Sequence, residues 1–400
     1  MDNLNTPSEG PRLTPLGRVF IFLFVIACIA GAYYLFVGKK SFQATKEAAT
    51  SMLGGGPPVE IGIAYGTEKQ RWMEWAVAEF AKTSDGKHIK INLIPMGSLE
   101  GAHAILSGDQ RIHAWSPASA AYKDIFIQEW QVKYNSDPIV REEAIALTPM
   151  VFVFWDERYQ QFIQKYKTVS LQTVSDALQA KGGWDEIAHH PEWGLFKFGH
   201  THPNQSNSGL MTIVLAAYSY HHKTKDLTLK DVLDVSFQNW LEQLERGASG
   251  MSNSTGNMMR EMVLKGPSSY DALFVYENVA IDYLKNAEGR WGQLRVVYPE
   301  YNAWNDNPFY IINASWSAPD QRKAADTFLN FLLTEPIQKE ALTHGFRPAN
   351  PNVPVKFADS PFVQYATNGV QVDLQKICEP PKAEVVNNLL ASWQRTQGNR

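Results

Sequence analysis

The residues of this sequence with the clearest chemical capability are small and polar, and they stand directly before or at the start of predicted helices. They offer hydroxyl groups and helix N-terminal N–H groups, which donate hydrogen bonds without carrying a charge. That donor set is typical of a site for a small polar solute, and for an oxyanion in particular. The residues are Gly66, Thr67, Ser98, Ser116, Ser119, Ser206, Asn207, Ser208 and Gly209.

The charged residues beside these groups bear on which solute is expected. The loops contain no arginine, and Lys69 is their only lysine, so neutral donors rather than ion pairs would hold an anion. Glu68 would repel an anion unless it faces away from the site or pairs with Lys69. If Glu68 points into the site, a cation or a neutral polyol becomes the expected solute.

Catalytic chemistry has weaker support in the sequence. The chain contains no HExxH, G-x-S-x-G, Walker or GxGxxG motif. Six histidines lie close together in the chain, and a metal-dependent hydrolase that uses them is one alternative. They lack the i, i+4 spacing of a helical metal motif, so we predict no catalytic residue, no metal and no cofactor. These histidines are His189, His190, His200, His202, His221 and His222.

Composition favours a folded protein that does not bind nucleic acid. The 400 residues are 44% apolar and 20% charged, which suffices for a large core. There are 37 Lys and Arg against 41 Asp and Glu, a net charge of −4, without the basic excess expected of a nucleic-acid binder. Two cysteines, Cys28 and Cys378, are too few for a disulfide framework.

The polar residues can lie close together if strands and helices alternate in the globular part, because the carboxyl ends of parallel strands then share one edge of a sheet. Residues 59–66 alternate as a strand does and precede a helix with apolar residues at helical spacing, and similar strands follow at 88–95 and 113–119. A long apolar strand at 143–155 opens a second set of elements. This order predicts an α/β fold with mainly parallel sheets, whose carboxyl ends carry the polar groups.

The N-terminal region indicates delivery to a membrane. Residues 19–37 form an uncharged apolar run long enough to cross a bilayer, and they predict a transmembrane helix or signal anchor. A cleaved secretory signal and a lipoprotein site at Cys28 remain open alternatives. Basic residues flank the run on both sides and do not decide its orientation. Residues 41–58, which end in three glycines and two prolines, predict a flexible linker.

Three motifs of the globular part resemble those of type II periplasmic solute-binding proteins, most closely the sulfate and molybdate branch. Residues 202–209 (HPNQSNSG) are similar to an Asn-Pro…Ser-Gly loop that opens a ligand-facing helix. Residues 275–280 (VYENVA) are similar to a Trp-Glu-Asn segment, and residues 344–354 (HGFRPANPNVP) to a His-Gly-Phe-Arg-Pro motif. Their order and spacing match across most of the chain after Val59.

The resemblance implies two discontinuous lobes that close on a ligand by a hinge motion. Residues 59–148 and 304–400 would form the first lobe, and residues 149–303 the second. The crossings map to Ala146–Met150 and Tyr301–Phe309.

The resemblance also adds Tyr276 and Glu277 to the expected solute contacts. Arg347, beside Pro348, is expected to position the C-terminal segment. The sequence departs from the branch at Asn207 and Ser208, which replace a common glycine pair, and at the loop 66–69, which replaces a simple serine-bearing turn.

The expected function is therefore solute binding for transport, with a membrane permease as partner and no enzymatic activity. Residues 1–18 would lie in the cytoplasm, residues 19–37 in the lipid bilayer, and the globular domain on the extracytoplasmic side. An alternative is a binding module that acts as a sensor or scaffold in a membrane complex. The membrane anchor and the atypical loop at Thr67 favour that alternative.

Overall fold

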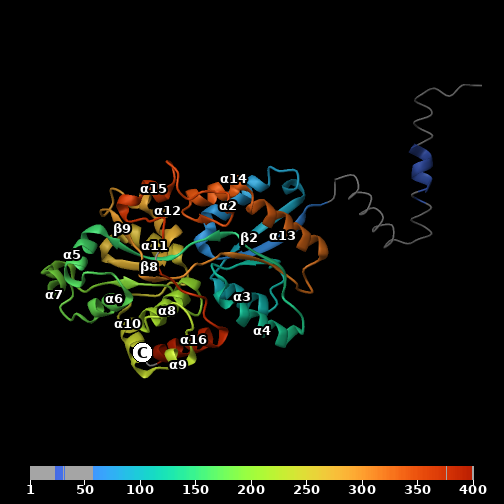
Figure 1. Cartoon of the computed structure of the whole chain (residues 1–400). Helices are drawn as coiled ribbons and strands as arrows, with labels where there is room; N and C mark the ends of the chain where they lie inside the picture. The colour runs from blue at the N-terminus through green and yellow to red at the C-terminus, as the bar shows by residue number, and fades with distance from the viewer. Residues whose placement is uncertain (1–22, 30, 32–56, 375, 399–400) are drawn as a thin grey trace, which may run out of the picture. The chain divides into compact units, whose positions relative to one another are not determined.

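The computed structural model describes residues 23–29, 31, 57–374 and 376–398 of the chain (Figure 1). The chain divides into two compact units, residues 1–58 and residues 59–400.

In the N-terminal unit, residues 23–29 form a helix whose large apolar side chains, such as Phe24, are exposed. Among the described residues, no helix combines the length and the apolar character needed to cross a membrane. The predictions for residues 1–18, for most of 19–37 and for 41–56 fall outside the described residues.

The first lobe is built on a five-stranded sheet of order β2-β1-β3-β11-β4. Its strands are β1 (Val59–Tyr65), β2 (Ile89–Pro95), β3 (Ala114–Ser116), β4 (Ile139–Ala144) and β11 (Pro308–Ile312). Its helices are α2 (Gln70–Phe80), α3 (Ser98–Leu106), α4 (Lys123–Tyr134), α13 (Pro319–Leu332) and α14 (Glu335–Thr343). Ile61 and Ile63 of β1 pack with α2, α13 and α14, whereas Ala64 packs with α3, because successive strand residues point to opposite faces.

The second lobe is built on a four-stranded sheet of order β7-β8-β6-β9. Its strands are β6 (Met150–Trp155), β7 (Phe198–Gly199), β8 (Ala272–Tyr276) and β9 (Leu294–Val297). Its helices are α5 (Asp156–Tyr166), α6 (Leu171–Gln179), α7 (Trp184–Ala188), α8 (Asn207–Tyr220), α9 (Leu229–Val232), α10 (Val235–Gly247), α11 (Thr255–Lys265) and α12 (Glu277–Ala287). Every residue of β6 and β8 is buried, as expected for strands covered by helices on both faces.

Both sheets are mixed, which differs in part from the prediction of mainly parallel sheets. In the first sheet β11 runs antiparallel to β3 and β4, and in the second β6 runs antiparallel to β8 and β9. These two strands are the first in their sheet after the chain crosses between the lobes. Each crossing segment reaches its sheet at the carboxyl ends of the neighbouring strands. The strand that follows the crossing must therefore run antiparallel to the strands beside it.

The two crossing segments lie side by side and are hydrogen-bonded to each other. Thr148 and Asn305 exchange backbone hydrogen bonds of 3.0 and 2.9 Å. The N–H of Ile145 donates to the carbonyl of Asn307 at 3.1 Å. Next to them, β5 (Ala146–Leu147) pairs with β12 (Arg347–Pro348). This ladder ties the two lobes together where their polar loops meet.

The C-terminal part of the chain contacts both lobes, whereas the sequence analysis places residues 304–400 in the first. The remaining elements are β10 (Tyr301–Asn302), β13 (Lys376–Ile377), α15 (Pro361–Gln364), the 3-10 helix η6 (Ala366–Asn368) and α16 (Ala383–Gly398). Strand β13 pairs with β10, and η6 packs on β9. Helix α16 packs on α8, α9 and α10 as well as on α4 (Figure 1). The apolar face of α16, with Val385, Leu389 and Trp393, is buried there.

The histidine in the core of the first lobe predicts a pH dependence of stability. His113 is 7% exposed, its Nδ1 accepts the backbone N–H of Gly62 at 2.9 Å, and burial lowers its pKa below 6.5. The unfolded chain therefore binds this proton more readily, so stability falls as pH drops below about 6.5.

We expect His113→Asn, which keeps an acceptor but cannot be protonated, to flatten the fall of unfolding free energy between pH 7 and pH 5. Urea titrations of both proteins at three pH values measure this, and parallel pH profiles would contradict it.

Candidate functional site

The predicted polar loops converge at the boundary between the lobes. Ser119 of the first lobe donates from Oγ to Oδ1 of Asn207 at 2.7 Å. Asn207, the first residue of α8, donates from Nδ2 to the hydroxyl of Tyr276 and to Oδ1 of Asn305, both at 3.0 Å. We call these four buried residues the interlobe seam. Three of the four are predicted site residues, and Asn305 comes from the second crossing segment.

A row of hydroxyl groups lies behind the seam within the second lobe. Ser208 Oγ lies 2.6 Å from the hydroxyls of both Thr201 and Thr255, and 3.3 Å from that of Ser206. Gly209 permits this packing, since a Cβ there would lie 2.2 Å from the carbonyl oxygen of Thr201. The sequence analysis does not include Thr255, although Ser254-Thr255 repeats the pattern of small polar residues before a helix.

The loops of the first lobe mostly bond to one another. The Gly66 N–H donates to the Ser116 carbonyl at 3.1 Å, and Ser98 Oγ accepts from the N–H of Ala118 at 3.0 Å. Ser116 Oγ is buried and has no hydrogen-bond partner among the described residues. Of the predicted residues in this lobe, Ser116 therefore keeps an unused donor, and Ser98 fixes the loop after β3.

The Glu68 side chain pairs with Lys69, one of the two arrangements in which it would not repel an anion. Lys69 is completely buried, and its Nζ lies 2.5 Å from Oε1 of Glu68. It also donates to the Pro117 carbonyl at 3.1 Å and to Oδ1 of Asn307 at 3.0 Å. Burial lowers the pKa of Lys69, and the adjacent carboxylate opposes that effect. The charge of Glu68 is thus balanced within the protein.

Glu277, a predicted solute contact, has its carboxylate engaged by other side chains. Arg347 donates to its two oxygens at 2.8 and 2.7 Å, and the hydroxyl of Tyr298 donates at 2.5 Å. Burial raises the pKa of Glu277, and these hydrogen bonds act against that rise. Arg347 also donates to the carbonyls of Gln371, at 2.7 Å, and Val372. This arrangement agrees with the expectation that Arg347 positions the C-terminal segment.

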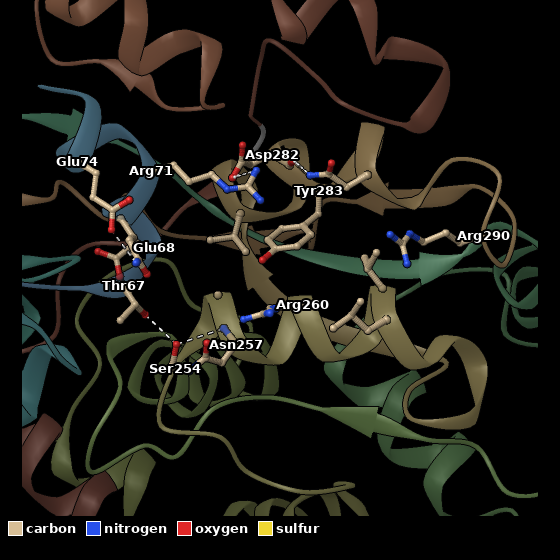
Figure 2. A pocket seen from close by; sticks show the side chains of 16 residues that line it. Thr67, Glu68, Arg71, Glu74, Ser254, Asn257, Arg260, Asp282, Tyr283 and Arg290 are labelled. Atoms are coloured by element: carbon tan, nitrogen blue, oxygen red, sulfur yellow. Dashed lines mark hydrogen bonds and ion pairs between the residues drawn. The ribbon is translucent and has the colours of Figure 1, made fainter. Parts of the chain in front are cut away.

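Open space between the lobes lies beside the seam rather than within it. A cavity of about 510 Å³ is bounded by the 3-10 helix η1 (Thr67–Lys69) and α2 on one side and by α11 and α12 on the other (Figure 2). Thr67 and Ser254 meet at one edge of it, where their hydroxyl oxygens are hydrogen-bonded at 2.9 Å. Among the residues predicted to bind solute, Thr67 is the one that lines this cavity.

The cavity is rich in charged side chains that come from helices rather than from the predicted loops. Arg71 of α2 pairs with Asp282 of α12 across the lobes at 3.0 Å, and its guanidinium lies 5.1 Å from the ring centre of Tyr283. Arg260 and Arg290 also line the cavity. Within the described part of the chain, neither has a carboxylate at ion-pair distance. Both arginines lie outside the strand-end loops in which the sequence predicts the solute contacts, so those loops gave no signal for them.

The histidines do not form a recognisable metal site. His200 is buried, with Nε2 at 3.2 Å from Glu245 Oε1, and His202 packs against the ring of Trp393. In the part of the chain that the structure describes, no group of three or more His, Cys, Asp or Glu side chains is placed to hold a metal ion.

Comparison with known proteins identifies the family. The model of a family described as bacterial extracellular solute-binding protein matches residues 61–347. The chain belongs to this family. Its members bind solutes and are not enzymes, and the solute-binding domain lies outside the cytoplasm. No curated protein matches the sequence.

Solved structures of other binding proteins have the same two-lobe fold as this extracellular solute-binding protein. The sulfate-binding protein SubI from Mycobacterium tuberculosis H37Rv matches 86% of this chain and 99% of its own, with 14% identity and a TM-score of 0.53. Iron-bound HitA from Pseudomonas aeruginosa matches 85% and 99%, with 14% identity and a TM-score of 0.55. AfuA from Actinobacillus pleuropneumoniae, with fructose-6-phosphate bound, matches 85% and 97%, with 14% identity and a TM-score of 0.54. At 14% identity, these structural matches show a shared fold.

The hydrogen bonds of the interlobe seam are expected to hold the two lobes closed. We expect Asn207→Ala to open them, because Ser119 and Asn305 lose a buried partner, at a cost of about 1–3 kcal/mol for each unsatisfied group. Small-angle X-ray scattering should then record a larger radius of gyration. Ser208→Ala is the matched control, since Ser208 bonds only within the second lobe and should leave the radius unchanged. Equal radii for wild type and Asn207→Ala would contradict the assignment.

Proposed function

We propose that this protein is the extracytoplasmic receptor of an ABC transporter and captures a small polar solute with an anionic group between its lobes. The observation that carries the proposal is the cavity between α2 and α11–α12, to which both lobes contribute. Its volume of about 510 Å³ lies within the range of about 300–1,000 Å³ that is usual for small-molecule sites. A solute there would contact Thr67 from one lobe and Ser254 from the other, and so would favour closure.

An anionic group fits this cavity better than a cationic one. Glu68 is neutralised by Lys69, and Asp282 is paired with Arg71, so that among the charged lining residues Arg260 and Arg290 outnumber the one remaining carboxylate, Glu74. Arginine binds oxyanion groups with directed hydrogen bonds. The predicted oxyanion preference is therefore retained in the proposal, but with arginines as donors in addition to hydroxyl groups.

We also propose that residues 19–37 hold the receptor at the membrane, with residues 1–18 in the cytoplasm. The apolar run in the sequence and the exposed apolar side chains of the helix at 23–29 support this. Full-length protein should appear in the membrane fraction, and a reporter that works only outside the cytoplasm should be active when fused after Gly56. A shortened, soluble product would argue for cleavage.

Isothermal titration calorimetry on the full-length protein tests the binding function. The panel contains sulfate, molybdate, tungstate, phosphate, organic phosphates, organic acids, hexoses and amino acids. At least one anion should bind with a Kd below about 100 μM. If no anion gives a binding signal at millimolar concentration, the proposal is overturned.

A second candidate, a sensor or scaffold module in a membrane complex, is favoured by one observation. The seam closes through direct side-chain hydrogen bonds, so Ser119, Asn207 and Tyr276 have partners without a solute. A protein that stays closed and binds no member of the panel would match this candidate.

A further inference from the structure

The lining of the interlobe cavity indicates more than a bare inorganic oxyanion. A molecule of liquid water occupies about 30 Å³, so a five-atom ion such as sulfate would fill only a small part of about 510 Å³. The remaining volume would have to hold water or a larger solute. The cavity therefore has room for a solute with a carbon skeleton.

The walls of the cavity offer apolar contact surface that an inorganic ion cannot use. Val263 and Leu264 of α11 and Val279 of α12 line it, together with the ring of Tyr283. Figure 2 shows the Tyr283 ring in the middle of the cavity, with Arg290 on one side of it and Thr67 and Glu74 of the first lobe on the other. Aliphatic and aromatic side chains of this kind favour burial of C–H groups.

The charges of the cavity that remain after the pairs Lys69–Glu68 and Arg71–Asp282 are set aside are divided between its two walls. Arg260 and Arg290 belong to the second lobe, and Figure 2 shows Arg290 on the far side of Tyr283 from Thr67 and Glu74, and Arg260 nearer to Asn257. The Glu74 carboxylate accepts a hydrogen bond from Gln70 Nε2 at 2.8 Å and lies on the first-lobe wall. A solute that matches both walls carries an anionic group at one end and hydrogen-bond donors, such as hydroxyl groups, at the other.

We infer that the solute is an organic anion, a phosphate or carboxylate group on a hydroxylated carbon skeleton, whose anionic group binds Arg260 and Arg290. The inference rests on the proposed function and names the class of its solute. The hydroxylated part lies toward Thr67, Ser254 and Glu74, and the skeleton packs against Tyr283. Because it contacts both walls, this solute links the lobes more effectively than an inorganic ion held by the second lobe alone.

Calorimetry on the full-length protein with five probes tests the inference. The probes are a hexose 6-phosphate, a hexuronate, inorganic phosphate, sulfate and the uncharged hexose. We expect one of the two organic anions to bind at least about 100-fold more tightly than inorganic phosphate, sulfate and the uncharged hexose. The organic phosphate and the carboxylate are tested separately, so the one that binds more tightly identifies the anionic group of the solute.

Variants test the placement of the anionic group. Arg260→Gln and Arg290→Gln should each weaken binding of the preferred organic anion by about ten- to a hundredfold, the loss expected for a charge-assisted hydrogen bond. Arg111→Gln is the matched control, because Arg111 is an exposed arginine paired with Asp109 outside the cavity. It should bind as the wild type does. Thermal unfolding of all three variants should stay within about 2 °C of the wild type.

The outcomes separate this inference from the proposed function. If an inorganic oxyanion binds as tightly as the organic anions, or the uncharged hexose binds equally well, the inference is overturned. Binding of an organic anion that neither arginine variant weakens would also overturn it. If no anion binds at all, the proposed function itself fails.

Discussion

Arg347→Met is expected to lower the free energy of unfolding by about 3–5 kcal/mol, because it leaves the carboxylate of Glu277 buried without its counter-ion. Glu277 is 0% exposed, and Arg347 donates to both of its oxygens. The substitution also removes the hydrogen bonds that hold the carbonyls of Gln371 and Val372. Urea unfolding at pH 7 measures the loss.

Two further variants make the Arg347 prediction specific. Glu277→Gln combined with Arg347→Met removes the buried charge and should recover part of the loss. Lys90→Met is the matched control, since the ion pair between Lys90 and Glu60 is more than half exposed and is screened by solvent. A loss of under about 1 kcal/mol for Arg347→Met would contradict the prediction.

The pH dependence of the same variant gives an independent readout. Without Arg347 the pKa of Glu277 rises further above its ordinary value, since only the hydrogen bond from Tyr298 then opposes the effect of burial. A group whose folded pKa is raised contributes stability at low pH and loses it as pH rises. The deficit of Arg347→Met should therefore be smaller at pH 5 than at pH 7. An equal deficit at both values would show that lost packing, and not the uncompensated charge, dominates.

Lys69→Met is expected to have a similarly large effect, again about 3–5 kcal/mol. The Glu68 side chain is only 4% exposed, and Lys69 is the cation that balances it. Lys69 also joins η1 to Pro117 and to Asn307 of the second crossing segment. Its loss should therefore loosen both the first-lobe loops and the hinge.

The double variant Glu68→Gln/Lys69→Met should recover part of the stability, because no uncompensated charge remains. Lys82→Met is the matched control, since Lys82 is exposed and pairs with Glu79 on the surface of α2. Thermal unfolding and calorimetry together make the test. Because Glu68 lines the cavity, Lys69→Met should weaken binding of an anion, whereas the double variant should not. Wild-type stability of Lys69→Met would contradict the prediction.

Local sequence patterns predicted the type of several elements and the family of the chain, although the single strand predicted at 143–155 is divided among β4, β5 and β6. The polar loop that ends at Gly209 and the apolar run after it predicted a helix at this place, and α8 begins at Asn207 within that loop, because a helix N-terminus is set by residues within one turn of it. The motifs at 202–209, 275–280 and 344–354 predicted the solute-binding family, which the match over residues 61–347 confirms. These signals are local in the chain, and so the sequence alone could carry them.

Only the tertiary structure decided which side chains meet. Ser119 and Asn207 are 88 positions apart, and Glu277 and Arg347 are 70 apart. The resemblance placed Glu277 among the solute contacts, but its partner comes from the end of the first-lobe sequence and engages both oxygens. The interlobe cavity likewise depends on how α2 approaches α11 and α12, which brings Arg260 to the site. Side-chain partners are set by long-range packing, whereas the residues next to them in the chain set only the local backbone.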